Sequence, residues 1–193
     1  MRRNCGAVPV RIRARFSFFA VLGFLICTDK DGVSVMCAAA CMLHELGHLA
    51  VMFAEKRLPT AIELYGGGIH ISGGSTSFPA AAAGVSVNLA LFILFGLIPW
   101  ENRDVRLFGT VNLLVAAFNL LPVGSLDGKL MLDKALVRAF PPENAVHISE
   151  LCEKMMLALV LPAVIVLVFS GLLNFSAVIF LIYILAVEFL EKI

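Results

Sequence analysis

Long runs of apolar residues, separated by short polar stretches, dominate the chain from residue 16 onward. An α-helix needs about 20 residues to cross the hydrocarbon core of a bilayer, within a range of about 17–25. Apolar runs of this order predict membrane-spanning helices, and a shorter run can cross when a flanking arginine reaches to the interface. The pattern predicts about six spans, at residues 16–28, 33–54, 79–100, 105–121, 155–171 and 175–190.

The composition agrees with this pattern. Hydrophobic residues make up 60% of the 193 residues and the mean hydropathy is +0.95, whereas soluble domains are roughly 45–50% apolar. The predicted fold class is therefore an all-α polytopic membrane protein whose partner is the lipid bilayer. The sequence has no long basic run and no interleaving of aromatic and basic residues, which argues against nucleic acid as a partner.

Two stretches break the helical pattern and predict strands. Residues 8–16 alternate apolar and basic side chains with a period of two. Residues 61–78 are rich in glycine and in β-forming residues. Non-helical backbone survives at membrane depth only where protein or water covers it, so we expect a small membrane-associated β-sheet on the cytoplasmic side. Residues 133–154 predict a cytoplasmic loop with a short helix on each side of the Pro-Pro pair at 141–142.

The distribution of lysine and arginine predicts the orientation of the chain. With six spans, both termini lie on one side of the membrane, and that side holds all of the 15 basic residues except Lys30, Arg103 and Arg106. Cytoplasmic loops carry an excess of Lys and Arg, so both termini are predicted to be cytoplasmic. The basic residues on that side are Arg2, Arg3, Arg11, Arg13, Arg15, Lys56, Arg57, Lys129, Lys134, Arg138, Lys154 and Lys192.

Three ionisable side chains, His44, Glu45 and His48, interrupt the apolar run at 33–54. Positions i and i+4 share one face of a helix, so both imidazoles can reach one metal ion. Glu45 lies about 100° around the helix from His44, where it can reach a water on that metal. This H-E-x-x-H arrangement supplies two zinc ligands and a general base. Ionisable residues inside a span are costly and mark a functional site, so the motif predicts a Zn²⁺ centre.

A catalytic zinc ion needs a third protein ligand and one open position. Cys37, Cys41, His44 and His48 follow one another at spacings of 4, 3 and 4 residues. The distance from Cys37 to His48 along the helix is about 16 Å, so one ion cannot bind all four side chains. Asp127 lies in NLLPVGSLDG (119–128), just past the cytoplasmic end of the fourth predicted span and at a depth similar to that of the histidines. Taken alone, Asp127-Gly128 is also an ordinary turn sequence. The candidates for the third ligand are Cys37, Cys41, His70, His147 and Asp127.

The two motifs together, HELGH (44–48) and NLLPVGSLDG (119–128), resemble the site-2 protease family of intramembrane zinc metallopeptidases, especially its compact bacterial members of the sporulation factor IVB type. The resemblance implies a strand before the first span, at residues 10–19, and a membrane-associated sheet at 61–78. It also implies a location in a bacterial plasma membrane. The site residues that it implies are His44, His48 and Asp127 as zinc ligands and Glu45 as catalytic base.

Residues 83–88, AGVSVN, resemble the A-G-P-x-x-x-N motif at the start of the family's third span, with Val85 at the proline position. Asn88 is then a candidate for steadying the substrate or the oxyanion, and an amide bonded between helices is the alternative interpretation. Asn119 is a second candidate for the substrate or oxyanion role. Lys129 stands where many relatives have glycine, so it is a candidate for altering substrate preference without changing the ligands.

The sequence therefore predicts a single intramembrane metalloprotease domain over residues 1–193, with no PDZ or CBS domain. The predicted reaction is hydrolysis of peptide bonds, near the cytoplasmic side of the bilayer, in a membrane protein or membrane-associated peptide. A regulatory membrane partner would be of unknown identity. The alternatives are a non-enzymatic metal transporter or zinc sensor, and a catalytically inactive scaffold. A transporter would spread ionisable residues along a path, whereas here they cluster at one depth, and the intact Glu45 argues against an inactive scaffold.

Overall fold

The computed structural model describes residues 11–16, 19–20, 23, 27, 29, 32–57, 59–65, 68–72 and 77–170. Helices dominate this part of the chain, with three short strands towards its N-terminal end. The elements in order are β1 (Arg11–Ala14), α2 (Val33–Ala54), β2 (Ala61–Tyr65), β3 (Gly68–Ser72), α3 (Phe78–Phe92), η1 (Ile93–Leu97), α4 (Arg103–Asn119), α5 (Asp127–Ala139) and α6 (Pro142–Phe169).

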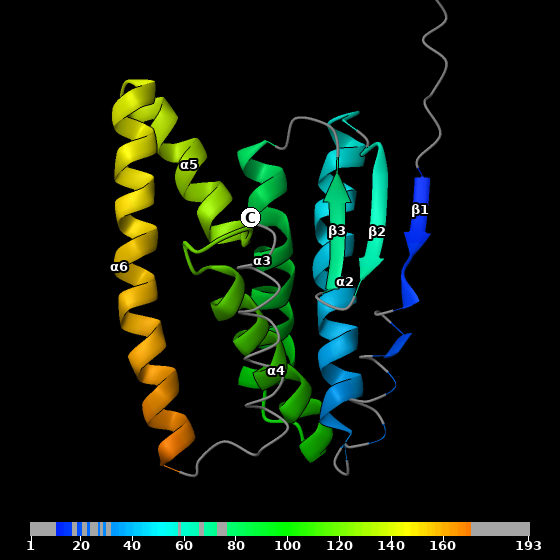
Figure 1. Cartoon of the computed structure of the whole chain (residues 1–193). Coiled ribbons are helices and arrows are strands. Elements are labelled where there is room, and N and C mark those ends of the chain that lie inside the picture. The colour runs from blue at the N-terminus through cyan, green and yellow to red at the C-terminus, as the bar shows by residue number, and fades with distance from the viewer. Residues whose placement is uncertain are drawn as a thin grey trace, which may run out of the picture.

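Helix α3 is the centre of the arrangement, because it contacts α2, α4 and α5. Figure 1 shows the three strands on the α2 side of the molecule and α6 at the opposite edge, beyond α5. Helix α6 packs against α5. Helix α2, which carries the first motif, also contacts α4, at whose last residue the second motif begins.

Small residues allow α2 and α3 to lie close together. Ala80, Ala81 and Ala83 on α3 are buried, and so is Ala40 on α2. A Cβ atom at Gly47 would lie 2.9 Å from Cγ2 of Val87 and 3.0 Å from the carbonyl oxygen of Ala83, so this part of the interface has room only for glycine. Backbones brought this close allow side chains of one helix to reach backbone carbonyls of the other.

The start of α3 is fixed by two signals in its own sequence. Ser77 is the N-cap, and its hydroxyl oxygen accepts a hydrogen bond from the backbone N–H of Ala80 at 3.1 Å. Pro79 follows at a position in the first turn where its missing N–H costs nothing. The Ser77 hydroxyl also donates to Oε1 of Glu55 at 2.7 Å, which ties the start of α3 to the end of α2.

Helix α4 and the end of the α3 segment meet at a pair of glycines. Helix α3 continues as the π-helical turn η1, and a Cβ atom at Gly109 on α4 would lie 2.3 Å from the backbone nitrogen of Gly96 in that turn. Deeper along the pair, Val111 and Val115 of α4 pack with Ala40 of α2 as a buried cluster. Helices α2, α3 and α4 each contact the other two.

The three strands form one sheet in the order β1-β2-β3, with β1 parallel and β3 antiparallel to β2. The expected pairing of residues 8–16 with residues 61–78 is confirmed for the strands at 11–14 and 61–65. Arg15, just after β1, forms an ion pair with Glu63 of β2 at 2.8 Å, which helps to fix this register. Strand β3 is an edge strand of the sheet within the described part of the chain.

Helices occur where the sequence predicted four of its spans. The predicted span at 33–54 coincides with α2, 79–100 corresponds to α3 and η1, 105–121 to α4, and 155–171 to the second half of α6. Two helices of the described residues, Val33–Ala54 and Phe78–Leu97, are long and apolar enough to cross a membrane, judged by length and composition. The predicted spans at 16–28 and 175–190 lie mostly or wholly outside the described residues, so the number six stays a prediction.

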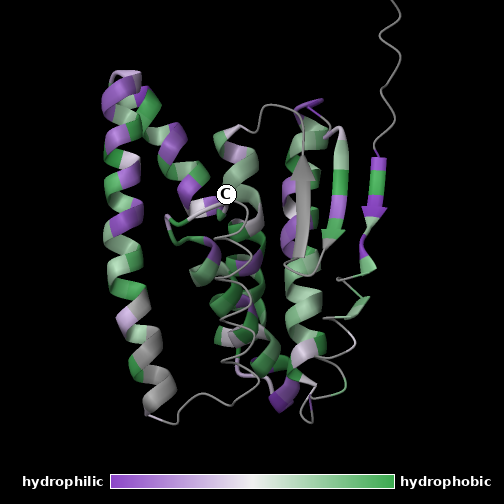
Figure 2. Ribbon diagram, in the orientation of Figure 1, coloured by the Kyte–Doolittle hydropathy of each residue, from purple (hydrophilic) through white to green (hydrophobic). Residues whose placement is uncertain are grey.

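The prediction for residues 133–154 was partly wrong. A helix does lie on each side of the Pro-Pro pair, but the second is not short, since α6 runs unbroken over 28 residues and includes Pro162. Figure 2 shows the reason: hydrophilic residues gather at the end of α6 next to α5, while hydrophobic residues follow further along the same helix. The change in hydropathy along residues 142–169 suggested a loop followed by a span, but the backbone forms one continuous helix there.

Candidate metal centre

Helix α2 presents His44 and His48 on one face, towards α3. Their side chains are 4% and 9% exposed, and their Nε2 atoms lie 3.1 Å apart. The i and i+4 spacing stacks the two rings one turn apart, with ring centroids 4.8 Å from each other. The imidazole pair predicted from the motif is therefore formed, and it is buried.

The connection between α4 and α5 delivers Asp127 to the same point. Oδ2 of Asp127 lies 2.8 Å from Nε2 of His44 and 3.0 Å from Nε2 of His48. Gly124 makes the turn with a φ angle of +56°, and a Cβ atom at Gly128 would lie 2.1 Å from the carbonyl oxygen of Leu120. Only glycine at position 128 allows α5 to start this close to the end of α4.

Asp127 is the acidic member of the group, and 15% of its side chain is exposed. A carboxylate is the form that binds a metal ion.

Each histidine is held from behind through its Nδ1 atom. Nδ1 of His48 lies 2.7 Å from the carbonyl oxygen of Ala80, and Nδ1 of His44 lies 2.6 Å from Oδ1 of Asn88. A carbonyl oxygen only accepts, so Nδ1 carries the proton and donates. Both Nε2 atoms then offer a lone pair towards the centre, which is the arrangement usual for metal-binding histidines.

Asn88 belongs to a buried pair of amides behind His44. Asn88 on α3 and Asn112 on α4 are both 0% exposed. Nδ2 of Asn88 donates to the carbonyl oxygen of Ala40 at 3.2 Å and to Oδ1 of Asn112 at 2.8 Å. Since both N–H groups of Asn88 are used, these contacts support the interhelical amide, and neither N–H is directed to a substrate as the oxyanion role requires.

The three converging side chains fit a zinc ion. His44, His48 and Asp127 each offer one ligand atom and form a group able to hold a metal. Ligand atoms of a tetrahedral zinc ion are about 3.3 Å apart for bonds of about 2.0–2.1 Å, so atoms separated by 2.8 to 3.1 Å need to move outward only slightly. Gly84 faces them, and a Cβ atom there would lie 2.5 Å from Nε2 of His48 and 2.6 Å from Nε2 of His44. Glycine keeps this face of the centre open.

Glu45 stands beside the centre and is not one of the converging ligands. It is half-buried on α2 and lies within electrostatic range of His44, His48 and Asp127. This is the position expected for a base that acts on a water at the centre.

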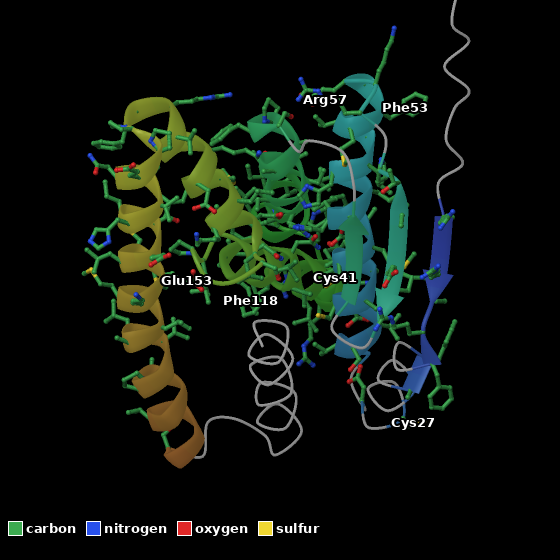
Figure 3. The ribbon with its side chains drawn as sticks, turned by 45° about the horizontal axis from the view of Figure 1, so that its top comes forward. Cys27, Cys41, Phe53, Arg57, Phe118 and Glu153 are labelled. Atoms are coloured by element: carbon green, nitrogen blue, oxygen red, sulfur yellow. The ribbon has the colours of Figure 1, made fainter. Side chains whose placement is uncertain are left out.

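The other predicted site residues lie apart from this group. Cys41 is exposed part-way along α2 (Figure 3), and His147 is exposed on α6. Nδ2 of Asn119 donates to the carbonyl oxygen of Val115 one turn back in α4, at 3.0 Å. The side chain of His70 lies outside the described part of the structure. Of the candidates that are described, Asp127 is the one that meets both histidines.

The chain is similar to known proteins in its fold and in part of its sequence. The site-2 protease of Methanocaldococcus jannaschii shares the fold, with a TM-score of 0.62 and 18% identity over 95% of this chain and 92% of that one. Rip3 of Mycobacterium tuberculosis, provisionally named a zinc metalloprotease, is 35% identical over 129 residues in each of two strains. No family model matches the chain. The chain is therefore similar to a zinc metalloprotease over part of its sequence and to a site-2 protease in its fold.

The similarity to Rip3 extends over 56% of this chain but only 30% of the length of Rip3. The partial similarity to Rip3 and the shared fold agree with the resemblance seen in HELGH and NLLPVGSLDG, while activity and substrate remain to be proposed. The division into one domain over residues 1–193 stays a prediction.

Two residues of this chain have contacts that the motifs did not predict. Asn112 is a single amide inside an apolar run, and its only signal in the sequence is that an amide in a span usually bonds another helix. Nζ of Lys129 lies 2.8 Å from Oδ1 of Asp133 on the same helix, α5, and 2.6 Å from Oγ of Ser149 on α6. Lys129 therefore joins α5 to α6, a contact that does not by itself suggest a role in substrate preference.

Proposed function

We propose that this protein is an intramembrane zinc metalloprotease that hydrolyses peptide bonds of membrane-associated substrates near the cytoplasmic side of the bilayer. The observation that carries the proposal is the convergence of His44, His48 and Asp127 on one point, with Glu45 beside it. Three protein ligands leave one coordination position open, which is the pattern of catalytic rather than structural zinc sites.

The exposed surface supports a location in the membrane. Large apolar side chains are exposed on several helices, including Leu46 and Phe53 on α2, Leu114 on α4 and Leu159 on α6. Extended apolar surface is rare on soluble monomers, and lipid is a suitable solvent for it. The bias of lysine and arginine supports cytoplasmic termini.

In the proposed reaction, zinc and the side chains of the protein have different roles. Zinc at this site would supply Lewis acidity, which lowers the pKa of a coordinated water towards neutrality and polarises a carbonyl group. Glu45 accepts the proton that the attacking water loses and returns it to the leaving amine when the C–N bond breaks. Asn88 and the Ala80 carbonyl keep His44 and His48 in the metal-binding tautomer.

The edge strand β3 suggests how a substrate is held. A helical peptide bond is protected by its own hydrogen bonds, so a substrate helix must unwind before attack. An extended segment can then add to an exposed sheet edge through main-chain hydrogen bonds. Within the described part of the chain β3 offers such an edge, and α3, which carries Gly84 and Asn88, is the element that follows it in the sequence.

Capture of the substrate tests the proposal. A Glu45→Gln variant keeps the ligands but lacks the base, so it should retain its substrate in native membranes. Crosslinking and mass spectrometry of this variant should recover a membrane-associated protein that the wild type then cleaves. A double variant that also carries Asp127→Ala is the matched control, since it lacks the metal site. Recovery of no protein that the wild type cleaves would favour a metal carrier instead.

A further inference from the structure

We infer that Asn112 is a positioning residue that sets the orientation of the Asn88 amide and, through it, the metal-binding tautomer of His44. The inference rests on the proposed metal site and not on proteolysis. It follows from a chain of hydrogen bonds that starts at the backbone of α4 and ends at the metal centre.

The chain starts from a fixed acceptor. Nδ2 of Asn112 donates to the carbonyl oxygen of Phe108 at 2.8 Å. A backbone carbonyl cannot donate, so the amide nitrogen of Asn112 must face it. Oδ1 of Asn112 is thereby turned away from Phe108 and towards α3, where it lies 2.8 Å from Nδ2 of Asn88.

The second amide passes this orientation on. Nδ2 of Asn88 meets two acceptors, Oδ1 of Asn112 at 2.8 Å and the carbonyl oxygen of Ala40 at 3.2 Å. The shorter of the two is the contact with Asn112. With both amide hydrogens engaged, Oδ1 of Asn88 is the atom left to face Nδ1 of His44, at 2.6 Å.

The orientation matters because the two ends of an amide demand opposite tautomers of histidine. When Oδ1 faces the ring, Nδ1 carries the proton and Nε2 keeps its lone pair. A flipped Asn88 would present its N–H groups to Nδ1, which would then have to accept, and the proton would move to Nε2. A protonated Nε2 cannot bind a metal ion.

Because the hydrogen bonds between Asn112, Asn88 and His44 are buried, the loss of one of these side chains should affect the others. Asn88 and Asn112 are both fully buried, so water is not at hand to replace a missing partner. His48 needs no such chain of hydrogen bonds, because its Nδ1 donates to the backbone oxygen of Ala80, whose polarity is fixed. The effect of Asn112 should therefore reach the metal through His44 alone.

A double-mutant cycle on zinc affinity tests the inference. Zinc affinity is measured on the full-length purified protein by competition with a chelator, with helical circular dichroism as the check on folding. Asn112→Leu removes the acceptor that orients Asn88 and should weaken zinc binding about 10- to 100-fold, as loss of such supporting contacts typically does. Thr110→Val is the control, because Thr110 bonds back to α4 in the same way but faces outward.

The second arm of the cycle uses Asn88→Asp. Both oxygens of this side chain accept, so its orientation no longer decides the tautomer of His44. In this background Asn112→Leu should cause no further loss of affinity. An equal loss in both backgrounds would mean that Asn112 acts only through packing, and no loss in the wild-type background would also overturn the inference.

Two other outcomes remain distinct. A wild-type protein that binds no zinc would overturn the proposed metal site and this inference with it, whereas a zinc-binding wild type with an insensitive Asn112 overturns the inference alone. If Asn112→Leu does not fold, Asn112→Ala removes the same acceptor with less bulk and carries the same expectation in both backgrounds.

Discussion

Nε2 of His44 lies 2.8 Å from Oδ2 of Asp127, although 83 positions separate the two residues in the sequence. The contact depends on close packing at two places: α2 against α3 at Gly47, and the start of α5 against the end of α4 at Gly128. The site is thus a product of helix packing, with each motif supplying only part of it.

Removal of Asp127 should empty the metal site. Asp127→Ala leaves two imidazoles and a wet coordination sphere, so we expect zinc content and proteolysis to fall together. Cys41→Ala is the comparison, because Cys41 is exposed on α2 and outside the converging group. Elemental analysis of both purified variants checks this. Full zinc in Asp127→Ala with loss in Cys41→Ala would show that the ligand assignment is wrong.

A methyl group at position 84 should compete with the metal for space. Its Cβ would lie within 2.6 Å of Nε2 in both histidines, so Gly84→Ala must push the rings apart or displace the ion. We expect zinc affinity to fall by at least tenfold, comparable to the loss of a supporting contact. In Gly23→Ala the added Cβ meets nothing within 4 Å and should leave affinity unchanged. Wild-type affinity in Gly84→Ala would refute the proposed position of the ion.

Lys129 should matter for the stability of the α5–α6 junction. Lys129→Met removes the largely buried ammonium group that joins Asp133 to Ser149, while the hydrogen bond from Ser149 to Asp133 remains. We expect the free energy of unfolding to fall by about 1–3 kcal/mol. Lys154→Met removes an exposed pair of the same i,i+4 spacing, 3.8 Å from Glu150, and should cost about 0–1 kcal/mol.

Denaturant titration in detergent, followed by circular dichroism, measures both changes. Glu153, labelled on α6 in Figure 3, also accepts from the backbone N–H of Gly124 at 3.2 Å. The junction therefore supports the turn that precedes Asp127. Equal stability of the two variants would show that Lys129 makes no special contribution to the junction.

Proline in β3 should separate substrate binding from metal binding. Successive N–H groups of a paired strand point to opposite edges, so Ile69 and Ile71 donate on one edge and His70 on the other. Proline removes one donor. If β3 holds the substrate, a proline whose missing N–H faced away from β2 should reduce cleavage at normal zinc content. A proline whose missing N–H faced β2 should instead weaken the pairing of the two strands. Normal cleavage by all three variants would exclude β3 as the docking edge.

The sequence was sufficient for features that depend on local patterns. The range of α2 was predicted correctly because polar residues, Asp29–Gly32 before it and Lys56–Arg57 after it, flank the mostly apolar run at 33–54. Period-two alternation predicted a strand in the region of β1, and the structure pairs this strand with β2. The proximity of His44 and His48 required only the geometry of one helix.

Features that depend on the packing of helices could not be predicted from local sequence patterns. The polar first half of α6 suggested a loop, because hydropathy reports the solvent of a segment and not its backbone conformation. The sequence alone left Asn88 between an oxyanion role and an interhelical amide, and only the positions of Ala40 and Asn112 favour the amide. Asn112 was missed because an isolated amide in an apolar run has no motif.

Zinc content and cleavage measured together in Glu45→Gln test the central claim most directly. The amide has the size of the carboxylate but cannot take a proton from the attacking water, while the three ligands stay in place. We expect zinc close to one ion per chain, as in the wild type, with cleavage of the captured substrate reduced by about 10²–10⁴-fold. Cleavage at the wild-type rate would contradict the protease mechanism.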